Sequence, residues 1–235
     1  VLPFLPVPDP ASWPYAAASV VIHVGYFALV GAAYRAGDMS FAYPLMRGTA
    51  PVLVTFASGP LIGEYLGLGA WSGVLLISAG VLGMTLAKSP AAAGARRLAA
   101  SLALGNAGII AVYTIVDGAG VRLSGSAAAY TMWVFLLTAL PIGAWALLLR
   151  RADLIAHCRS RWHFGLIGGA CTLGAYVLAL WAMTQAPVAL VAALRETSIL
   201  FGTALSAVVL KERFGWHRHA AALTVVSGAV VLKLS

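Results

Sequence analysis

The sequence predicts an all-α integral membrane protein built around an internal repeat. Hydrophobic residues make up 61% of the 235 residues and charged residues only 9%, whereas about a quarter of the residues in a soluble domain are charged. Eight apolar segments approach the roughly 20 residues that a transmembrane helix needs. Two of these segments share one pattern of polar and small residues, and each includes an arginine within its apolar run.

The eight expected transmembrane helices are joined by short connections. They are predicted at 14–35, 40–63, 68–87, 99–121, 126–149, 163–185, 187–210 and 216–234. Gly, Ala and Ser are frequent in them, and small residues allow helices to approach closely in lipid. The longest connections are 88–98 and 150–162, and the first of these is the natural boundary between two halves.

The repeat relates residues 14–87 to residues 162–235 at a constant offset of 148 residues. The matched residues are Arg47, Thr49, Thr55, Ser58, Glu64, Gly67 and Gly80 with Arg195, Thr197, Thr203, Ser206, Glu212, Gly215 and Gly228. Each matched unit holds three helices, and two more helices precede the second unit. Symmetry therefore predicts two helices ahead of residue 1, so that 1–88 holds helices three to five and 89–235 holds helices six to ten. Five helices per repeat, an odd number, make the repeats inverted in the membrane.

The basic residues are distributed as topology signals and not as a nucleic-acid surface. The net charge is +8, but thirteen of the fifteen Lys and Arg residues lie between apolar segments, with no basic face or tail. If the spans alternate, eleven of them fall on one side of the membrane and two on the other, which places the first side in the cytoplasm. Cys158 and Cys171 have no metal-binding spacing, and no metal or cofactor is expected.

Arg47 and Arg195 are the strongest candidates for substrate-binding residues. Each lies about eight residues inside its segment, hence about 12 Å deep and near the middle of a ~30 Å hydrocarbon core. A guanidinium at this depth must face protein or water. Its planar fork matches the oxygens of a carboxylate or phosphonate substrate, and the alternative is a structural lock to an acceptor on a neighbouring helix. Glu196 could carry a coupling proton or neutralise one of the arginines.

Further candidate substrate contacts are aromatic or polar residues of the apolar segments, namely His23, Tyr26, Tyr43, Tyr113 and Trp181. His23 and Tyr26 lie three residues apart on one helix face, and Tyr43 lies one turn before Arg47. Such aromatic rings can enclose part of a substrate. Plain packing or a place in the aromatic belt at the membrane surface would explain them equally well, and a lone histidine is more often a packing residue than a proton carrier.

Two further patterns indicate where the helices are polar or bent. Asn106, Tyr113 and Asp117 share one helix face, which faces water or a partner helix, and the place of Asp117 near the end of its segment favours the membrane interface. Pro44 and Pro51 bracket Arg47, and each removes a backbone donor and can kink the helix. A kink at this point suits either a gate or a static bend.

Catalytic and nucleotide-binding motifs are absent from the sequence. It contains no zincin motif, no phosphate-binding loop of the Walker type and no G-x-S-x-G nucleophile turn. An enzyme is therefore not expected. Without a nucleotide site, any transport would draw its energy from an ion or solute gradient.

The two repeated blocks, AYPLMRGTAPVLVTFASGPLIGEYLG and AALRETSILFGTALSAVVLKERFG, resemble the EamA family of the drug/metabolite transporter superfamily. The segments LPFLPVPDPASWPY and HVGYFALVGAAYRAGDMSFAYPLMRG are similar to the branch associated with phosphonate utilisation. The resemblance implies a ten-helix transporter of two inverted five-helix repeats around a central cavity. It also implies that the eight candidate residues line that cavity: His23, Tyr26, Tyr43, Arg47, Tyr113, Trp181, Arg195 and Glu196.

These observations together predict a multi-pass permease of the inner membrane that moves small metabolites by alternating access. The expected partners are membrane lipid and a small anionic or zwitterionic substrate, such as an amino acid or a phosphonate, with proton coupling as an option. One alternative is an exporter of drugs or amphiphiles that uses the aromatic residues and not the arginines. Another is a membrane scaffold, in which the charges form paired locks in a closed, packed centre. The oligomeric state is not indicated.

Overall fold

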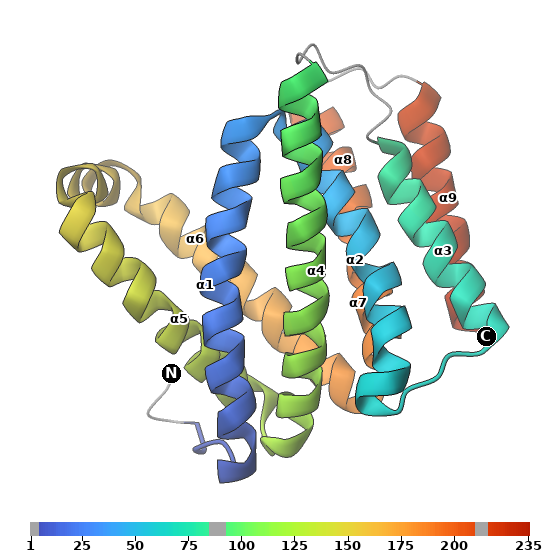
Figure 1. Ribbon diagram of the computed structural model, residues 1–235, viewed down its shortest axis with the longest axis horizontal. Helices are drawn as coiled ribbons and strands as arrows, with labels where there is room; N and C mark the ends of the chain where they lie inside the picture. Colours follow the sequence, from blue (N-terminus) through green and yellow to red (C-terminus); the bar gives the residue numbers. More distant parts are fainter. Residues whose placement is uncertain (1–4, 85–92, 210–215) are drawn as a thin grey trace. The chain divides into compact units, whose positions relative to one another are not determined.

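The computed structural model describes residues 5–84, 93–209 and 216–235, and every regular element in these ranges is helical (Figure 1). A short 3-10 helix at Pro10–Ser12 leads into the first long helix. The helices are α1 (Trp13–Ala36), α2 (Met39–Ile62), α3 (Leu68–Gly83), α4 (Ala93–Leu123), α5 (Ala127–Leu149), α6 (Arg151–Gln185), α7 (Val188–Arg195), α8 (Ser198–Val209) and α9 (Trp216–Leu234). The prediction of an all-α protein is confirmed for this part of the chain.

Five stretches of the described helices are long and apolar enough to cross a membrane. They are Pro10–Ala36, Met39–Ile62, Arg96–Leu123, Ala127–Leu149 and Arg151–Gln185. The apolar helix α3 has 16 residues, fewer than the roughly 20 that span a bilayer without adjustment. Large apolar side chains such as Leu148 and Phe164 are exposed along α5 and α6, as expected of surfaces that lipid covers. Several spans are thus present, while the count of eight and the ten-helix architecture remain predictions.

The connection predicted at 150–162 is helical instead. Helix α6 begins at Arg151, and its backbone leaves the helical region inside this stretch at Arg161, with φ −132° and ψ 21°. The physical reason lies in the composition, because residues 150–162 include neither Gly nor Pro to end a helix. Charged residues alone do not stop helix formation, so the prediction of a loop was wrong.

The helix predicted at 187–210 is broken in the middle. Helix α7 ends at Arg195, Glu196 and Thr197 form a turn, and α8 begins at Ser198. Across the break the amide of Glu196 bonds to the carbonyl three residues back, as does the amide of Thr197. The Thr197 hydroxyl also donates to the Leu194 carbonyl at 2.7 Å, and such local bonds compete with the helical pattern. The break therefore falls at one candidate site residue, Glu196, and directly after another, Arg195.

Helix packing divides the chain into two compact units that each draw helices from both predicted repeats. Unit 1 is Val1–Gly25 with Val116–Gln185, and unit 2 is Tyr26–Ile115 with Ala186–Ser235. Unit 1 contains α5 and α6, which pack on each other (Figure 1), and buries Tyr130, Leu180 and Met183. The two units share α1 and α4, because each of these helices has one part in unit 1 and the other part in unit 2. The repeat boundary after residue 88 is a matter of sequence similarity and stays a prediction.

Unit 2 is organised around α3, which packs against α9, α2 and α7. Its apolar core includes Val74, Ile77 and Val81 of α3, Ala193 of α7 and Val225 of α9. Helices α3 and α9 lie side by side (Figure 1), and they run antiparallel, since Gly69 lies by Ser235 and Gly83 by Ala221.

The contact between α3 and α9 looks the same from either helix, because residues that the repeat matches exchange places in it. A Cβ atom on Gly80 would lie 2.8 Å from the Ala221 carbonyl oxygen and 2.9 Å from the Val225 nitrogen. A Cβ atom on Gly228 would lie 2.9 Å from the Gly73 oxygen and 2.7 Å from the Ile77 nitrogen. The sequence offset maps Gly80 to Gly228, Gly73 to Ala221 and Ile77 to Val225. A two-fold axis perpendicular to both helices produces this pattern, and inverted repeats require such an axis in the membrane plane.

Candidate functional site

A largely buried ion pair joins Arg47 of α2 to Glu196, the residue that follows α7. The Nε atom of Arg47 donates to Oε2 of Glu196 at 2.8 Å, and the side chains are 15% and 7% exposed. Of the two roles that the sequence left open for Glu196, the structure places it as the partner of an arginine. The arginine concerned belongs to the other repeat and is not its chain neighbour, Arg195.

Three tyrosines surround the Arg47 guanidinium. Tyr26 of α1, Tyr43 of α2 and Tyr113 of α4 all lie close enough to interact with it electrostatically. The rings of Tyr26 and Tyr113 meet edge to face, with their centroids 5.7 Å apart, a favourable geometry for an aromatic pair. Five of the predicted site residues thus meet in unit 2: Tyr26, Tyr43, Arg47, Tyr113 and Glu196.

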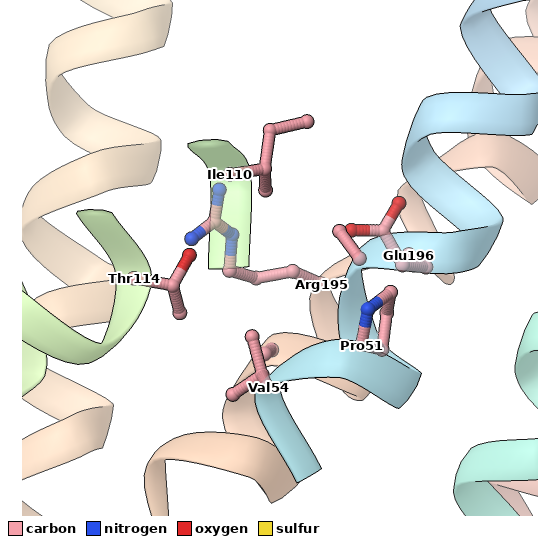
Figure 2. A pocket seen from close by; sticks show the side chains of 8 residues that line it. Pro51, Val54, Ile110, Thr114, Arg195 and Glu196 are labelled. Carbon is pink, nitrogen blue, oxygen red and sulfur yellow. The ribbon is translucent and has the colours of Figure 1, made fainter. Parts of the chain in front are cut away.

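Arg195 lines a small cavity beside this ion pair. The cavity is bounded by Ala50, Pro51 and Val54 of α2, Ile110 and Thr114 of α4, and Ala192, Arg195 and Glu196. Figure 2 shows the Arg195 guanidinium reaching toward Thr114 and Ile110, while the Glu196 carboxylate points to the α2 side. The volume is about 10 Å³, which is room for one water molecule. This cavity therefore has no room for a solute larger than water.

The repeat supplies two arginines to this region but one carboxylate. The offset that relates Arg47 to Arg195 relates Glu196 to Gly48, which has no side chain to ionise. The Glu196 carboxylate interacts with both guanidinium groups, most strongly with Arg47. When Glu196 is ionised, these three residues carry one net positive charge. A site with this balance favours a ligand that brings at least one negative charge.

Glu64 holds the start of the short helix that ends in Arg195. Its Oε2 atom accepts a hydrogen bond at 2.7 Å from the amide of Val188, the first residue of α7. The N-cap residue itself, Pro187, offers no side-chain cap. Gly63, at φ 73°, ends α2 in the left-handed conformation and so turns the chain toward α7. The acidic turn of the first repeat thus works as a helix cap across the fold, whereas Glu212 of the second repeat lies outside the described residues.

Replacing Glu64 by alanine should lower the free energy of unfolding by about 1 kcal/mol, within the usual 0.5–2 kcal/mol range for a lost cap. The amide of Val188 would lose its acceptor, and α7 would fray toward Arg195. Glu64→Gln keeps a carbonyl oxygen and should recover most of the loss. Chemical unfolding in detergent measures both. The control is Asp38→Ala, which removes an exposed cap whose bond to Ser40 is longer, at 3.4 Å; a larger effect there would contradict the assignment.

His23 and Asp117 belong to a separate cluster in unit 1. Asp117 is 0% exposed and accepts hydrogen bonds from the hydroxyl groups of Tyr130, at 3.1 Å, and Tyr176, at 2.5 Å. His23 lies on α1 and interacts with the same carboxylate. Asp117 is therefore buried inside the protein, while its expected place at the membrane interface stays a prediction. Helix α4 continues six residues beyond Asp117 to Leu123, and neighbouring helices cover the side chain.

Trp181 is the remaining predicted site residue, and Thr114 and Tyr130 are two residues of the clusters that were not predicted. Trp181 lies on α6 in unit 1 and is 57% exposed, so its role as a substrate contact stays a prediction. Thr114 and Tyr130 were not predicted, because a single hydroxyl on an apolar helix gives no periodic signal. No group of three or more His, Cys, Asp or Glu residues that could hold a metal ion occurs in the described ranges.

Known proteins resemble this chain in their fold and in their sequence family. A solved structure, titled only "Crystal structure of protein", has a TM-score of 0.71 and 19% sequence identity, over 94% of this chain and 76% of that chain. At this identity the likeness concerns the fold alone. No curated protein matches the chain. Comparison with protein families matches residues 97–234 to the EamA-like transporter family. This match covers more than half of the sequence, and the chain therefore belongs to the EamA-like transporter family, a membrane-transporter family of the drug/metabolite transporter superfamily.

Proposed function

We propose that the protein is a secondary active permease of the inner membrane for small zwitterionic metabolites. Amino acids and aminophosphonates are the substrate classes, the latter in keeping with the resemblance to the phosphonate-associated branch. The observation that carries the proposal is the buried Arg47–Glu196 pair with Arg195 beside it. Transport proceeds by alternating access of the two repeats around this site.

The substrate must bring a negative and a positive group, because the ion pair consists of a guanidinium and a carboxylate. An anion that took the Arg47 guanidinium alone would leave the Glu196 carboxylate buried without its strongest partner, which costs several kcal/mol. A zwitterion avoids this cost, since its acidic group binds a guanidinium while its ammonium group binds Glu196. The second guanidinium, from Arg195, offers additional donors to the acidic group. Phosphonates suit this arrangement because they have one more oxygen than a carboxylate.

In this proposal the small cavity beside Arg195 belongs to one state of the transport cycle. A volume of about 10 Å³ holds no solute larger than water, so the substrate enters only after α2, α4 and α7 separate. The break between α7 and α8 provides a place for this movement, because the turn at Glu196 and Thr197 interrupts the regular helical bonding. Broken helices beside the substrate site are a recurring feature of secondary transporters.

Two other functions remain as outcomes of the test. A scaffold protein would also show a paired, packed centre, but membership in a transporter family favours transport. An exporter of lipophilic cations would use Tyr26, Tyr43 and Tyr113, but the net positive charge of the two arginines and Glu196 opposes a cationic cargo. The zwitterion proposal is the one that uses both charges.

Thermal unfolding of the purified full-length protein with a panel of solutes tests the proposal. The panel contains glycine, alanine, 2-aminoethylphosphonate, methylphosphonate, a sugar phosphate and tetraphenylphosphonium. A solute that binds the folded state at 100 times its Kd stabilises by about 2.7 kcal/mol. We expect a rise in Tm with the zwitterions that disappears in Glu196→Gln, whereas methylphosphonate gives a smaller rise. A rise with tetraphenylphosphonium alone would support the exporter, and no shift with any solute would favour the scaffold.

A further inference from the structure

The buried cluster around Asp117 in unit 1 has a charge that its surroundings do not permanently balance. The groups that face the carboxylate are Ser19 and His23 of α1, Tyr130 of α5 and Tyr176 of α6. Serine and tyrosine are uncharged near neutral pH, and histidine has a neutral form. None of the four residues is a lysine or arginine. A buried carboxylate surrounded in this way is costly while it is ionised. One added proton, on Asp117 or on His23, removes the imbalance.

Hydrogen bonds within unit 1 hold both the His23 ring and the Asp117 carboxylate. The Nδ1 atom of His23 lies 2.9 Å from the Ser19 carbonyl oxygen. The Ser19 hydroxyl oxygen lies 3.1 Å from the same nitrogen, so Ser19 holds Nδ1 in either tautomer of the neutral ring. On the carboxylate, each oxygen already accepts one phenolic hydrogen. The ring and the carboxylate thus lie in one buried cluster, each held by hydrogen bonds.

We propose that Asp117, together with His23, is the site at which this transporter takes up its coupling proton. The inference rests on the proposed transport function and adds the driving ion to it. Glu196, the other buried carboxylate of the candidate sites, is engaged by Arg47 at 2.8 Å. Asp117 is held by hydroxyl groups, which donate to an ionised carboxylate and can accept from a neutral one. A proton can thus enter and leave the Asp117 cluster without breaking the Arg47–Glu196 ion pair.

The chain provides a link between proton uptake and the substrate site. Helix α4 carries Asp117 and, one turn earlier, Thr114 of the cavity beside Arg195. Helix α1 carries His23 and, three residues later, Tyr26 near Arg47. A change of charge at the Asp117 cluster alters the forces on both helices. These two helices are therefore the elements through which a proton would bias the opening of the substrate site.

Charge movement after a pH step, measured on proteoliposomes adsorbed to a solid-supported membrane, tests the proposal without any substrate. A proton that enters a buried site produces a transient current. We expect the transient in the wild-type protein and in Glu196→Gln, and we expect its loss in Asp117→Asn, which keeps the size and the accepting oxygen of the side chain. Asp117→Glu should recover part of the current.

The outcomes separate this inference from the proposed function. A transient that survives in Asp117→Asn, that is lost in Glu196→Gln, or that is absent from the wild-type protein would overturn the proton site. Should Asp117→Asn fail to give a folded protein, the current is measured in His23→Asn and Tyr176→Phe. The proposal then requires its half-maximal pH to shift in both, and an unchanged pH would contradict it. The zwitterion-induced rise in Tm, measured separately on each variant, reports on the substrate site and should persist in Asp117→Asn.

Discussion

Replacing Arg47 by alanine should lower the free energy of unfolding by about 3–5 kcal/mol and abolish the stabilisation by zwitterions. The variant leaves the Glu196 carboxylate buried at 7% exposure without the guanidinium that donates to it, and an uncompensated buried charge carries a penalty of this size. Arg195 interacts with the same carboxylate and offsets a part of the loss. Urea unfolding in detergent gives the stability, and the solute panel gives the binding.

A double variant separates the structural role of the pair from its role in binding. Arg47→Met combined with Glu196→Leu replaces both charges by apolar groups of similar volume, and such replacements of buried ion pairs are often neutral or stabilising. We expect the double variant to regain most of the stability that Arg47→Ala loses, while zwitterion binding and transport remain absent. A double variant that is stable and transports at the wild-type rate would show the pair to be a lock with no part in binding.

The matched control is the exposed ion pair between Arg150 and Asp153. Its two side chains are 67% and 75% exposed, and their charged atoms lie 3.4 Å apart. Exposed pairs contribute roughly 0–1 kcal/mol, so Arg150→Ala should unfold close to the wild-type protein and bind the same solutes. A loss in Arg150→Ala as large as that in Arg47→Ala would mean that the charge of the whole protein, and not the buried pair, determines the result.

Arg47 and Arg195 could be singled out from the sequence because the repeat and the membrane act together. An arginine in the middle of an apolar segment has few tolerable surroundings, and its recurrence 148 residues later indicates a functional position. The partner of Arg47 was not predictable in the same way. Glu196 neighbours Arg195 in the chain, and its pairing with Arg47 depends on how α2 packs against α7, which local sequence does not encode.

The break after Arg195 and the burial of Asp117 were missed for physical reasons that differ. The two threonines Thr49 and Thr197 are matched in the repeat, yet Thr49 bonds to the carbonyl four residues back within a continuous helix, whereas Thr197 bonds to the one three residues back. Residue type alone does not distinguish these outcomes. Asp117 lies six residues from the end of α4, a place that suits an interface. Its actual burial comes from tyrosines on α5 and α6, which are distant in sequence.

Alanine at Gly80 or at Gly228 should destabilise the protein by about 1–3 kcal/mol, the usual cost of overpacking. Each new Cβ atom would lie within 2.9 Å of backbone atoms of the partner helix, and backbone cannot turn away as a flexible side chain can. Helices α3 and α9 would have to separate. The control is Gly83→Ala on the same helix, whose Cβ atom would meet Ala221 Cβ at an ordinary 3.6 Å. There the higher helix propensity of alanine should give a neutral or slightly stabilising change.

The two glycine variants also test the symmetry of the fold, because reciprocal contacts make a prediction that a chance contact does not. If a two-fold axis relates the environments of Gly80 and Gly228, the two single variants should lose the same stability within the error of unfolding measurements. The double variant should lose less than the sum, because helices that have already separated for one methyl group accommodate the second at lower cost. The opposite result would be two single variants that lose different amounts of stability and a double variant that loses their exact sum. It would mean that α3 and α9 meet without the symmetry of the repeat, and the inverted arrangement would lose its structural support.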